Sequence, residues 1–197
     1  MIQELLPQDL VEMAMSVSTE SLPITLFREF ECCFLHLDLR DYTGLTATER
    51  SQDVAELIHE IFCAFDVCLM KLGAECKVFK VDTVGDAYEA AAFFTSSVDE
   101  PEVARRNADI CASVYGIGRA FIEIVIECGK AKGKTLASRA GLAHGRVVAG
   151  MLGKLQPRFH LLGDPVNRAQ KLEAEAAINS VNVCPALQSL LALSQFP

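Results

Sequence analysis

Two segments decide the fold of this chain: FLHLDLRDYTGLT at residues 34–46 and FKVDTVGDAYEA at residues 79–90. Each is a short apolar run that leads to an aspartate, Asp38 in the first and Asp86 in the second. Gly85 and Asp86 form the centre of a predicted β-hairpin turn, which can set a carboxylate beside the end of a neighbouring strand. Two carboxylates placed there repel unless a cation lies between them, and Mg2+ prefers such oxygen ligands. The pair indicates either a metal site or ordinary turn chemistry, in which each aspartate only caps its own turn.

Composition limits the classes of protein to which this chain can belong. It has 197 residues, 51% of them hydrophobic, which is enough for one large domain with a substantial core. The formal net charge is -8 and no long cluster of Lys and Arg interrupts the acidic balance, which argues against a nucleic-acid-binding surface.

The cysteines indicate a reducing compartment. All eight lie in apolar stretches and none is in CxxC spacing, so neither a zinc site nor a redox motif is predicted. No secretory signal is visible, and the uncharged residues 176–197 are interrupted by Asn, Pro, Gln and Ser, which makes them a poor membrane span. We therefore expect a cytoplasmic domain without a membrane span, or the cytosolic domain of a larger membrane-attached protein.

The hydrophobic pattern predicts alternating strands and helices. Residues 2–15 have helical spacing, so residues 1–30 are assigned to a lead-in or linker and residues 31–197 to one domain. Within it we expect strand 32–39, helix 51–72, a hairpin around Val84 and Gly85, helix 102–127, strands 139–143 and 147–151 joined by a turn at 144–146, strand 158–162, helix 165–177, strand 181–184 and helix 186–193. This order defines a mixed α/β (α+β) class with a ferredoxin-like βαββαβ core and a C-terminal elaboration.

Five stretches carry a further pattern: LLPQDLV at residues 5–11, the two segments quoted above, RAGLAHGRVVAGMLG at 139–153 and PRFHLLGDPVNRAQKLE at 157–173. In this order and at this spacing they resemble the catalytic domain of class III nucleotidyl cyclases, the adenylyl and guanylyl cyclases. The resemblance covers most of the chain and is closer to guanylyl cyclases. It implies the class III cyclase fold.

The resemblance also implies a reaction and its cofactors. In the family, a nucleoside triphosphate loses pyrophosphate as its own ribose 3′-hydroxyl attacks the α-phosphate, and two Mg2+ or Mn2+ ions clamp the in-line displacement. By resemblance, Asp38 and Asp86 are the side-chain ligands, and the backbone carbonyl of Leu39 completes one metal site. The chain is therefore predicted to be a nucleotidyl cyclase, which is a phosphorus–oxygen lyase.

Asp82 and His160 occupy the two positions that contact the base in the family. Guanylyl cyclases carry Glu at the first position and adenylyl cyclases usually carry Lys. A carboxylate accepts hydrogen bonds from guanine N1–H and its amino group, whereas adenine N1 needs a donor, so Asp82 favours GTP over ATP despite being shorter than Glu. The alternatives are an acid on the exposed side of the hairpin for Asp82 and a packing residue for His160.

Asn167 and Lys171 lie one turn apart on the same face of a predicted helix. In the family the first position orients the ribose, and the second is an Arg that stabilises charge developing on the phosphate. A lysine at position 171 keeps the positive charge of the family's Arg but cannot make its two parallel hydrogen bonds. Alternatively, Lys171 is simply a solvated charge on the helix surface.

Asp41 is a second departure from the family, because the family has Gly there. No counterpart of the late strand with its phosphate-binding Lys is found, so the sequence is either truncated at its C-terminal end or does not use that half of a site.

Family domains pair head to tail: one subunit supplies the metal aspartates, and the other supplies the base pocket, the Asn and the Arg. The sequence therefore predicts a homodimer, or a heterodimer with another cyclase domain, and Lys171 is typical of a metal-donating partner.

The predicted activity is conversion of GTP to 3′,5′-cyclic GMP and pyrophosphate. The alternatives are an adenylyl cyclase that makes cyclic AMP from ATP, or a degenerate regulatory pseudo-cyclase. A diguanylate cyclase or polymerase palm would need a Gly-Gly-acidic-acidic turn, which residues 83–86 lack.

Overall fold

The computed structural model describes residues 27–74, 76–94, 101–153, 155 and 158–192. The predicted helix at residues 2–15 lies outside these ranges. The first strand already begins at Phe27, so residues 27–30 belong to the sheet rather than to the lead-in. The elements are β1 (Phe27–Leu39), α2 (Tyr42–Thr48), α3 (Ser51–Leu72), β2 (Phe79–Val84), β3 (Ala87–Phe94), α4 (Pro101–Ala131), β4 (Ser138–Leu152), β5 (Arg158–Leu162), α5 (Asp164–Glu175), β6 (Val181–Val183) and α6 (Pro185–Leu191).

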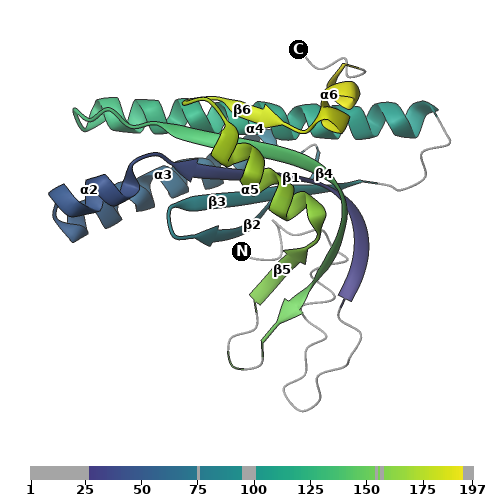
Figure 1. Ribbon diagram of the computed structural model, residues 1–197, viewed down its shortest axis with the longest axis horizontal. Coiled ribbons are helices and arrows are strands. Elements are labelled where there is room, and N and C mark those ends of the chain that lie inside the picture. Colours follow the sequence, from purple (N-terminus) through teal and green to yellow (C-terminus); the bar gives the residue numbers. More distant parts are fainter. Residues whose placement is uncertain (1–26, 75, 95–100, 154, 156–157, 193–197) are drawn as a thin grey trace.

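A six-stranded sheet organises the domain (Figure 1). Its strands follow the order β2-β3-β1-β4-β5 with every neighbouring pair antiparallel, and β6 pairs parallel to β4. The strand β1 is central, paired along one edge with β3 and along the other with β4. The first four strands, with α3 and α4 as connections, have the order of a ferredoxin-like βαββαβ core, so the predicted fold class is confirmed.

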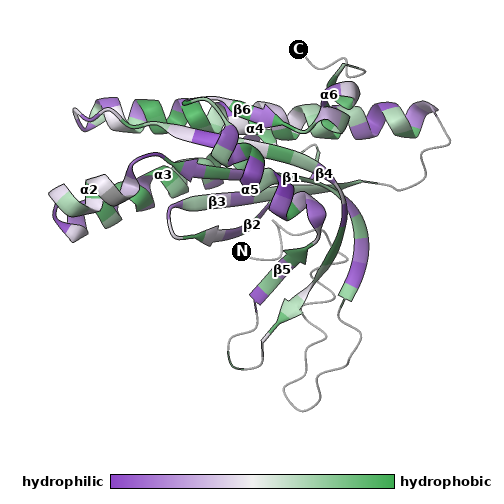
Figure 2. Cartoon of the chain, in the orientation of Figure 1, coloured by the Kyte–Doolittle hydropathy of each residue, from purple (hydrophilic) through white to green (hydrophobic). Residues whose placement is uncertain are grey.

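Helices cover both faces of the sheet. On one face α4 lies against β1, and a Cβ added to Gly118 would lie 3.1 Å from a methyl carbon of Leu35. Side chains alternate between the faces along a strand, so the next residue, His36, lies on the opposite face. Its cross-strand partner Gly141 lies on that face too, against the backbone of α5. The helix α5 therefore crosses the sheet on the face opposite α4 (Figure 1), and most of its surface is hydrophilic (Figure 2). Its buried edge consists of Pro165, Ala169 and Glu173.

The two long helices agree with the apolar spacing of the sequence. The helix α3 has the predicted bounds, and Gly73 is its C-cap. The helix α4 continues past residue 127, where it was predicted to end, and includes Gly129. Gly129 is instead a point of close packing, because an added Cβ would lie 2.9 Å from the carbonyl oxygen of Lys134. Among the described helices, none is both long and apolar enough to cross a bilayer.

The predicted turn at residues 144–146 is wrong. The structure has one continuous strand there, β4, and Gly145 pairs with Cys32 of β1 in the middle of the ladder. Gly145 has φ 149°, and an added Cβ would lie 3.1 Å from Pro165 Cγ at the start of α5. The glycine thus permits α5 to approach the strand and does not reverse the chain.

Gly141→Ala should disrupt the packing of α5 on the sheet. The added Cβ would lie 1.9 Å from the carbonyl oxygen of Ala169 and 2.5 Å from the backbone nitrogen of Glu173, and neither backbone atom can move alone. We expect a loss of about 2 kcal/mol or more in the free energy of unfolding, measured by urea denaturation. The matched control is Gly116→Ala in α4, where nothing lies within 4 Å of the new Cβ. That change should stabilise the helix by about 0.8 kcal/mol, and equal effects of the two substitutions would contradict the packing account.

Candidate active site

Strand pairing brings Asp38 and Asp86 together. Asp38 lies near the end of β1, directly opposite Ala87 of β3, and Asp86 immediately precedes Ala87 in the hairpin turn. That turn has two residues between the paired Val84 and Ala87, and its Gly85 has φ 64°, a conformation that favours glycine. The predicted meeting of one strand end with one Gly-Asp turn is therefore present in the structure.

The electrostatics of this pair suit a cation. Burial, the charge of Asp86 and the charge of Glu173 raise the pKa of Asp38 to about 6, against partial compensation from His36 and Arg139. Burial is also the main cause that raises the pKa of Asp86, with Glu173 adding to it. After burial, the charge of Asp86 is the largest cause of the raised pKa of Asp38. A divalent ion between the two carboxylates would remove this penalty.

A third carboxylate near the pair was missed by the sequence reasoning. Glu173 is buried on the inner edge of α5, where its Oε1 accepts hydrogen bonds from Arg139 Nε at 2.8 Å and lies 2.6 Å from Arg139 Nη2. Arg139 Nη1 also donates to the carbonyl oxygen of Ala174 at 3.1 Å. The sequence signal was its spacing, since Glu173 continues the four-residue repeat of Pro165 and Ala169 along the buried edge of the helix.

The donor set fits a hard divalent ion. Across the described ranges, no group of three or more His, Cys, Asp and Glu side chains is placed to hold a metal. Glu89 is engaged elsewhere, because it is buried and paired with His36 Nδ1 at 3.1 Å. Two carboxylates and the Leu39 carbonyl are nevertheless sufficient protein ligands for Mg2+ or Mn2+, since Mg2+ usually keeps several waters and takes further oxygens from substrate phosphates.

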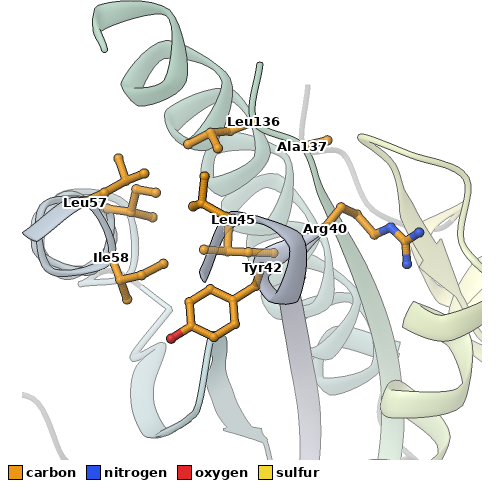
Figure 3. A pocket seen from close by; sticks show the side chains of 9 residues that line it. Arg40, Tyr42, Leu45, Leu57, Ile58, Leu136 and Ala137 are labelled. Atoms are coloured by element: carbon orange, nitrogen blue, oxygen red, sulfur yellow. The ribbon is translucent and has the colours of Figure 1, made fainter. Parts of the chain in front are cut away.

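The loop after β1 accommodates an aspartate at position 41. This residue has φ 62° and ψ 26°, the left-handed conformation that suits the glycine found there in the family, and aspartate tolerates it better than most residues. The Asp41 side chain lies over Gly44, where an added Cβ would be 2.5 Å from Asp41 Oδ1. The short helix α2, which was not predicted, then packs Leu45 and Tyr42 toward Leu57 and Ile58 of α3, while the Arg40 guanidinium points away from this small apolar pocket (Figure 3).

Asp82 and His160 lie on strands that meet across the curved sheet. The rings of Phe79 in β2 and Phe159 in β5 are 6.1 Å apart, although these strands are at opposite ends of the strand order. Both candidate base contacts are half-buried. A register shift between Lys80 and Asp82 redirects Asp82, whose Oδ1 accepts a hydrogen bond from the Thr83 backbone at 2.7 Å.

Asn167 and Lys171 lie on the exposed side of α5. Arg168, between them, is paired with Asp164 one turn earlier, whereas Lys171 makes no ion pair with any described residue. Lys171 is also absent from the charges that act on Asp38. The structure therefore brings Asp38 and Asp86 together but places Asn167 and Lys171 on another side of α5.

Comparison with known proteins identifies the family of the chain. A profile of the family described as "Adenylate and Guanylate cyclase catalytic domain" matches residues 27–197, so the chain belongs to this family of class III nucleotidyl cyclase domains. Retinal guanylyl cyclase 2 of Homo sapiens is 30% identical over 141 residues, which are 70% of this chain and 12% of that protein. The chain thus spans a small part of the length of this relative.

Solved structures share the fold. The guanylate cyclase domain of RhGC from Catenaria anguillulae, in complex with GTP, has a TM-score of 0.66 at 24% identity, covering 83% of this chain and 84% of that one. The adenylyl cyclase CyaB from P. aeruginosa has a TM-score of 0.69 at 20% identity, covering 84% and 82%. Since one structure is a guanylyl and the other an adenylyl cyclase, the fold does not discriminate between the two bases.

Asp38→Asn should stabilise the metal-free protein in a pH-dependent way. Because the folded-state pKa of Asp38 is raised from 3.8 to about 6, its contribution to stability is present below pH 3.8 and is lost as the pH rises through 6. The variant should therefore match the wild type near pH 4 and exceed it above pH 6, in urea denaturation with a chelator present. Glu123→Gln, exposed on α4, is the control and should show no such divergence. A constant difference between wild type and Asp38→Asn across this range would contradict the raised pKa.

Proposed function

We propose that this domain converts GTP to 3′,5′-cyclic GMP and pyrophosphate at a composite site between two cyclase domains. The observation that carries the proposal is the placement of Asp38 and Asp86 at adjoining strand ends, where burial and mutual repulsion raise the pKa of Asp38. Such a pair is costly in an apo protein and becomes favourable when divalent ions bind. All eight cysteines are free, which supports a reducing, cytosolic compartment for the domain.

The residues of this chain divide the chemistry between binding and orientation. When bound, two Mg2+ or Mn2+ ions supply activation of the attacking hydroxyl and neutralisation of the triphosphate. Asp38, Asp86 and the Leu39 carbonyl would hold these ions at the end of β1. The ribose 3′-hydroxyl gives up its proton to solvent and its oxygen forms a bond to the α-phosphorus, while the bond from that phosphorus to the bridging oxygen breaks and pyrophosphate leaves.

Base selection is assigned to Asp82, with His160 as the second contact. The Asp82 carboxylate can accept from guanine N1–H and the amino group, which adenine cannot satisfy in the same way. The contact between Phe79 and Phe159 supports this assignment, because it brings together the strands that carry the two residues. GTP is therefore the proposed substrate and ATP the weaker one.

The ribose-orienting Asn and the cation that stabilises the phosphate are assigned to α5 of the other domain in the dimer. Asn167 and Lys171 are exposed and face away from the metal aspartates of their own chain, which supports a role across an interface. Lys171 stands where the family has Arg, and a lysine cannot make the bidentate contact to phosphate oxygens. This observation favours a second assignment, in which the chain mainly donates metal ligands to a partner domain with intact Asn and Arg.

Product analysis tests the reaction and its metal ligands. With Mn2+, the competent dimer should form cyclic GMP from GTP faster than cyclic AMP from ATP, as measured by chromatography of the products. Asp38→Ala or Asp86→Ala should abolish turnover, because either change removes half of the carboxylate pair, while circular dichroism should show a folded protein. Near-normal turnover of either variant would disprove the two-metal assignment. Faster formation of cyclic AMP than of cyclic GMP would instead indicate an adenylyl cyclase.

Mixing two inactive variants tests the composite site. Asp38→Ala and Asn167→Ala chains should each be inactive alone, yet a mixture should recover about a quarter of wild-type activity, because half of the random dimers contain one intact site. A mixture that stays inactive, while the wild type alone is active, would place all the residues in one chain. If the wild type alone is silent, activity should appear when it is mixed with a domain that carries Asn and Arg, and Lys171→Arg should restore little by itself.

A further inference from the structure

A polar network connects helix α3 to the hairpin that carries Asp82 and Asp86. The hydroxyl of Tyr88 in β3 donates to Asp66 Oδ1 of α3 at 2.5 Å. Lys80 in β2 donates to the same Asp66 Oδ1 at 3.0 Å, and its Nζ lies 4.7 Å from the centre of the Tyr88 ring. One carboxylate on α3 therefore binds a side chain from each strand of the hairpin.

The Tyr88 ring fixes this network in the core. Tyr88 is fully buried, and its ring centre lies 5.5 Å from that of Phe62 and 5.2 Å from that of Phe65, both on α3. Phe121 of α4 completes the contacts at 5.3 Å. Because aromatic pairs add specific geometry to apolar burial, the hydroxyl has little freedom to leave Asp66.

The network and the metal pair occupy opposite faces of the same hairpin. Tyr88 pairs with Leu37 of β1, whose side chain is on the face covered by α3 and α4, whereas Ala87 pairs with Asp38 on the other face. Tyr88 is two residues after Asp86, and Lys80 is two residues before Asp82. A displacement of Asp66 would therefore shift both strands that hold the candidate metal and base contacts.

We propose that Asp66, Tyr88 and Lys80 form a clamp through which α3 positions the hairpin and thereby Asp86 and Asp82. These three are positioning residues, since they act on Asp86 and Asp82 through the hairpin strands that they hold against α3. The clamp rests on the proposed function only for its effect on metal binding. Its mechanical part, the attachment of the hairpin to α3, can be measured without any substrate.

Hydrogen exchange tests the attachment in the metal-free protein. Tyr88→Phe removes one hydroxyl and keeps the ring, so hairpin amides in β2 and β3 should exchange about tenfold faster, the size expected for loss of a hydrogen bond to a charged group. Amides of β4 and α5 should change much less. Tyr115→Phe on α4 is the matched control and should leave the hairpin unchanged. Asp66→Asn, which still accepts from Tyr88, should have a smaller effect than Asp66→Ala.

Mn2+ binding, followed by electron paramagnetic resonance, tests the consequence for the site. Tyr88→Phe should weaken Mn2+ binding several-fold, and it should have no further effect in an Asp86→Ala background. Unchanged hairpin exchange, or equal acceleration throughout the sheet, would overturn the clamp. If Asp86→Ala binds Mn2+ as the wild type does, the proposed metal site fails, while the exchange experiment still decides whether the clamp exists.

Discussion

The double pairing of β1 determines where the chemistry of this domain can occur. The strand is hydrogen-bonded to β3 along one edge and to β4 along the other, and the described core packs on both of its faces. Asp38, near its end, is therefore located by two registers at once, opposite Ala87 on one side and Arg139 on the other. A slip of one residue in either register would turn Asp38 to the face covered by α3 and α4 and separate it from Asp86.

The charges beside Asp38 come from four elements. Asp38 comes from β1, Asp86 from the hairpin turn and Glu173 from α5, while Arg139 on β4 holds Glu173 and lowers the cost of ionising Asp38. The Arg139–Glu173 pair also attaches α5 to the sheet beside the metal pair. The buried edge of this helix therefore carries a charge that acts on Asp38. Its exposed side carries Asn167 and Lys171, which are proposed to act in the partner's site.

Much of this arrangement could be predicted from the sequence, where local chemistry is decisive. The apolar spacing and terminal glycine predict α3 correctly, and Gly85 with Asp86 predicts the hairpin turn. Prediction failed at Gly145 and Gly129, because a glycine that permits close approach of another element has the same local sequence as one that ends a strand or a helix. Glu173 was missed because its partner, Arg139, is distant in the sequence and only the tertiary fold brings them together.

The central position of β1 has a consequence for biosynthesis. Phe27 of β1 pairs with Gly150 of β4, so the second edge of the strand stays unpaired until β4 has left the ribosome, about ten seconds later at ordinary rates of synthesis. The contact of β1 with β3 is available much sooner, and it already brings Asp38 next to Asp86. Synthesis thus makes the strands that carry the carboxylate pair available before β4 can cover the other edge of β1, an interval in which an exposed apolar edge is open to chaperone binding or premature association.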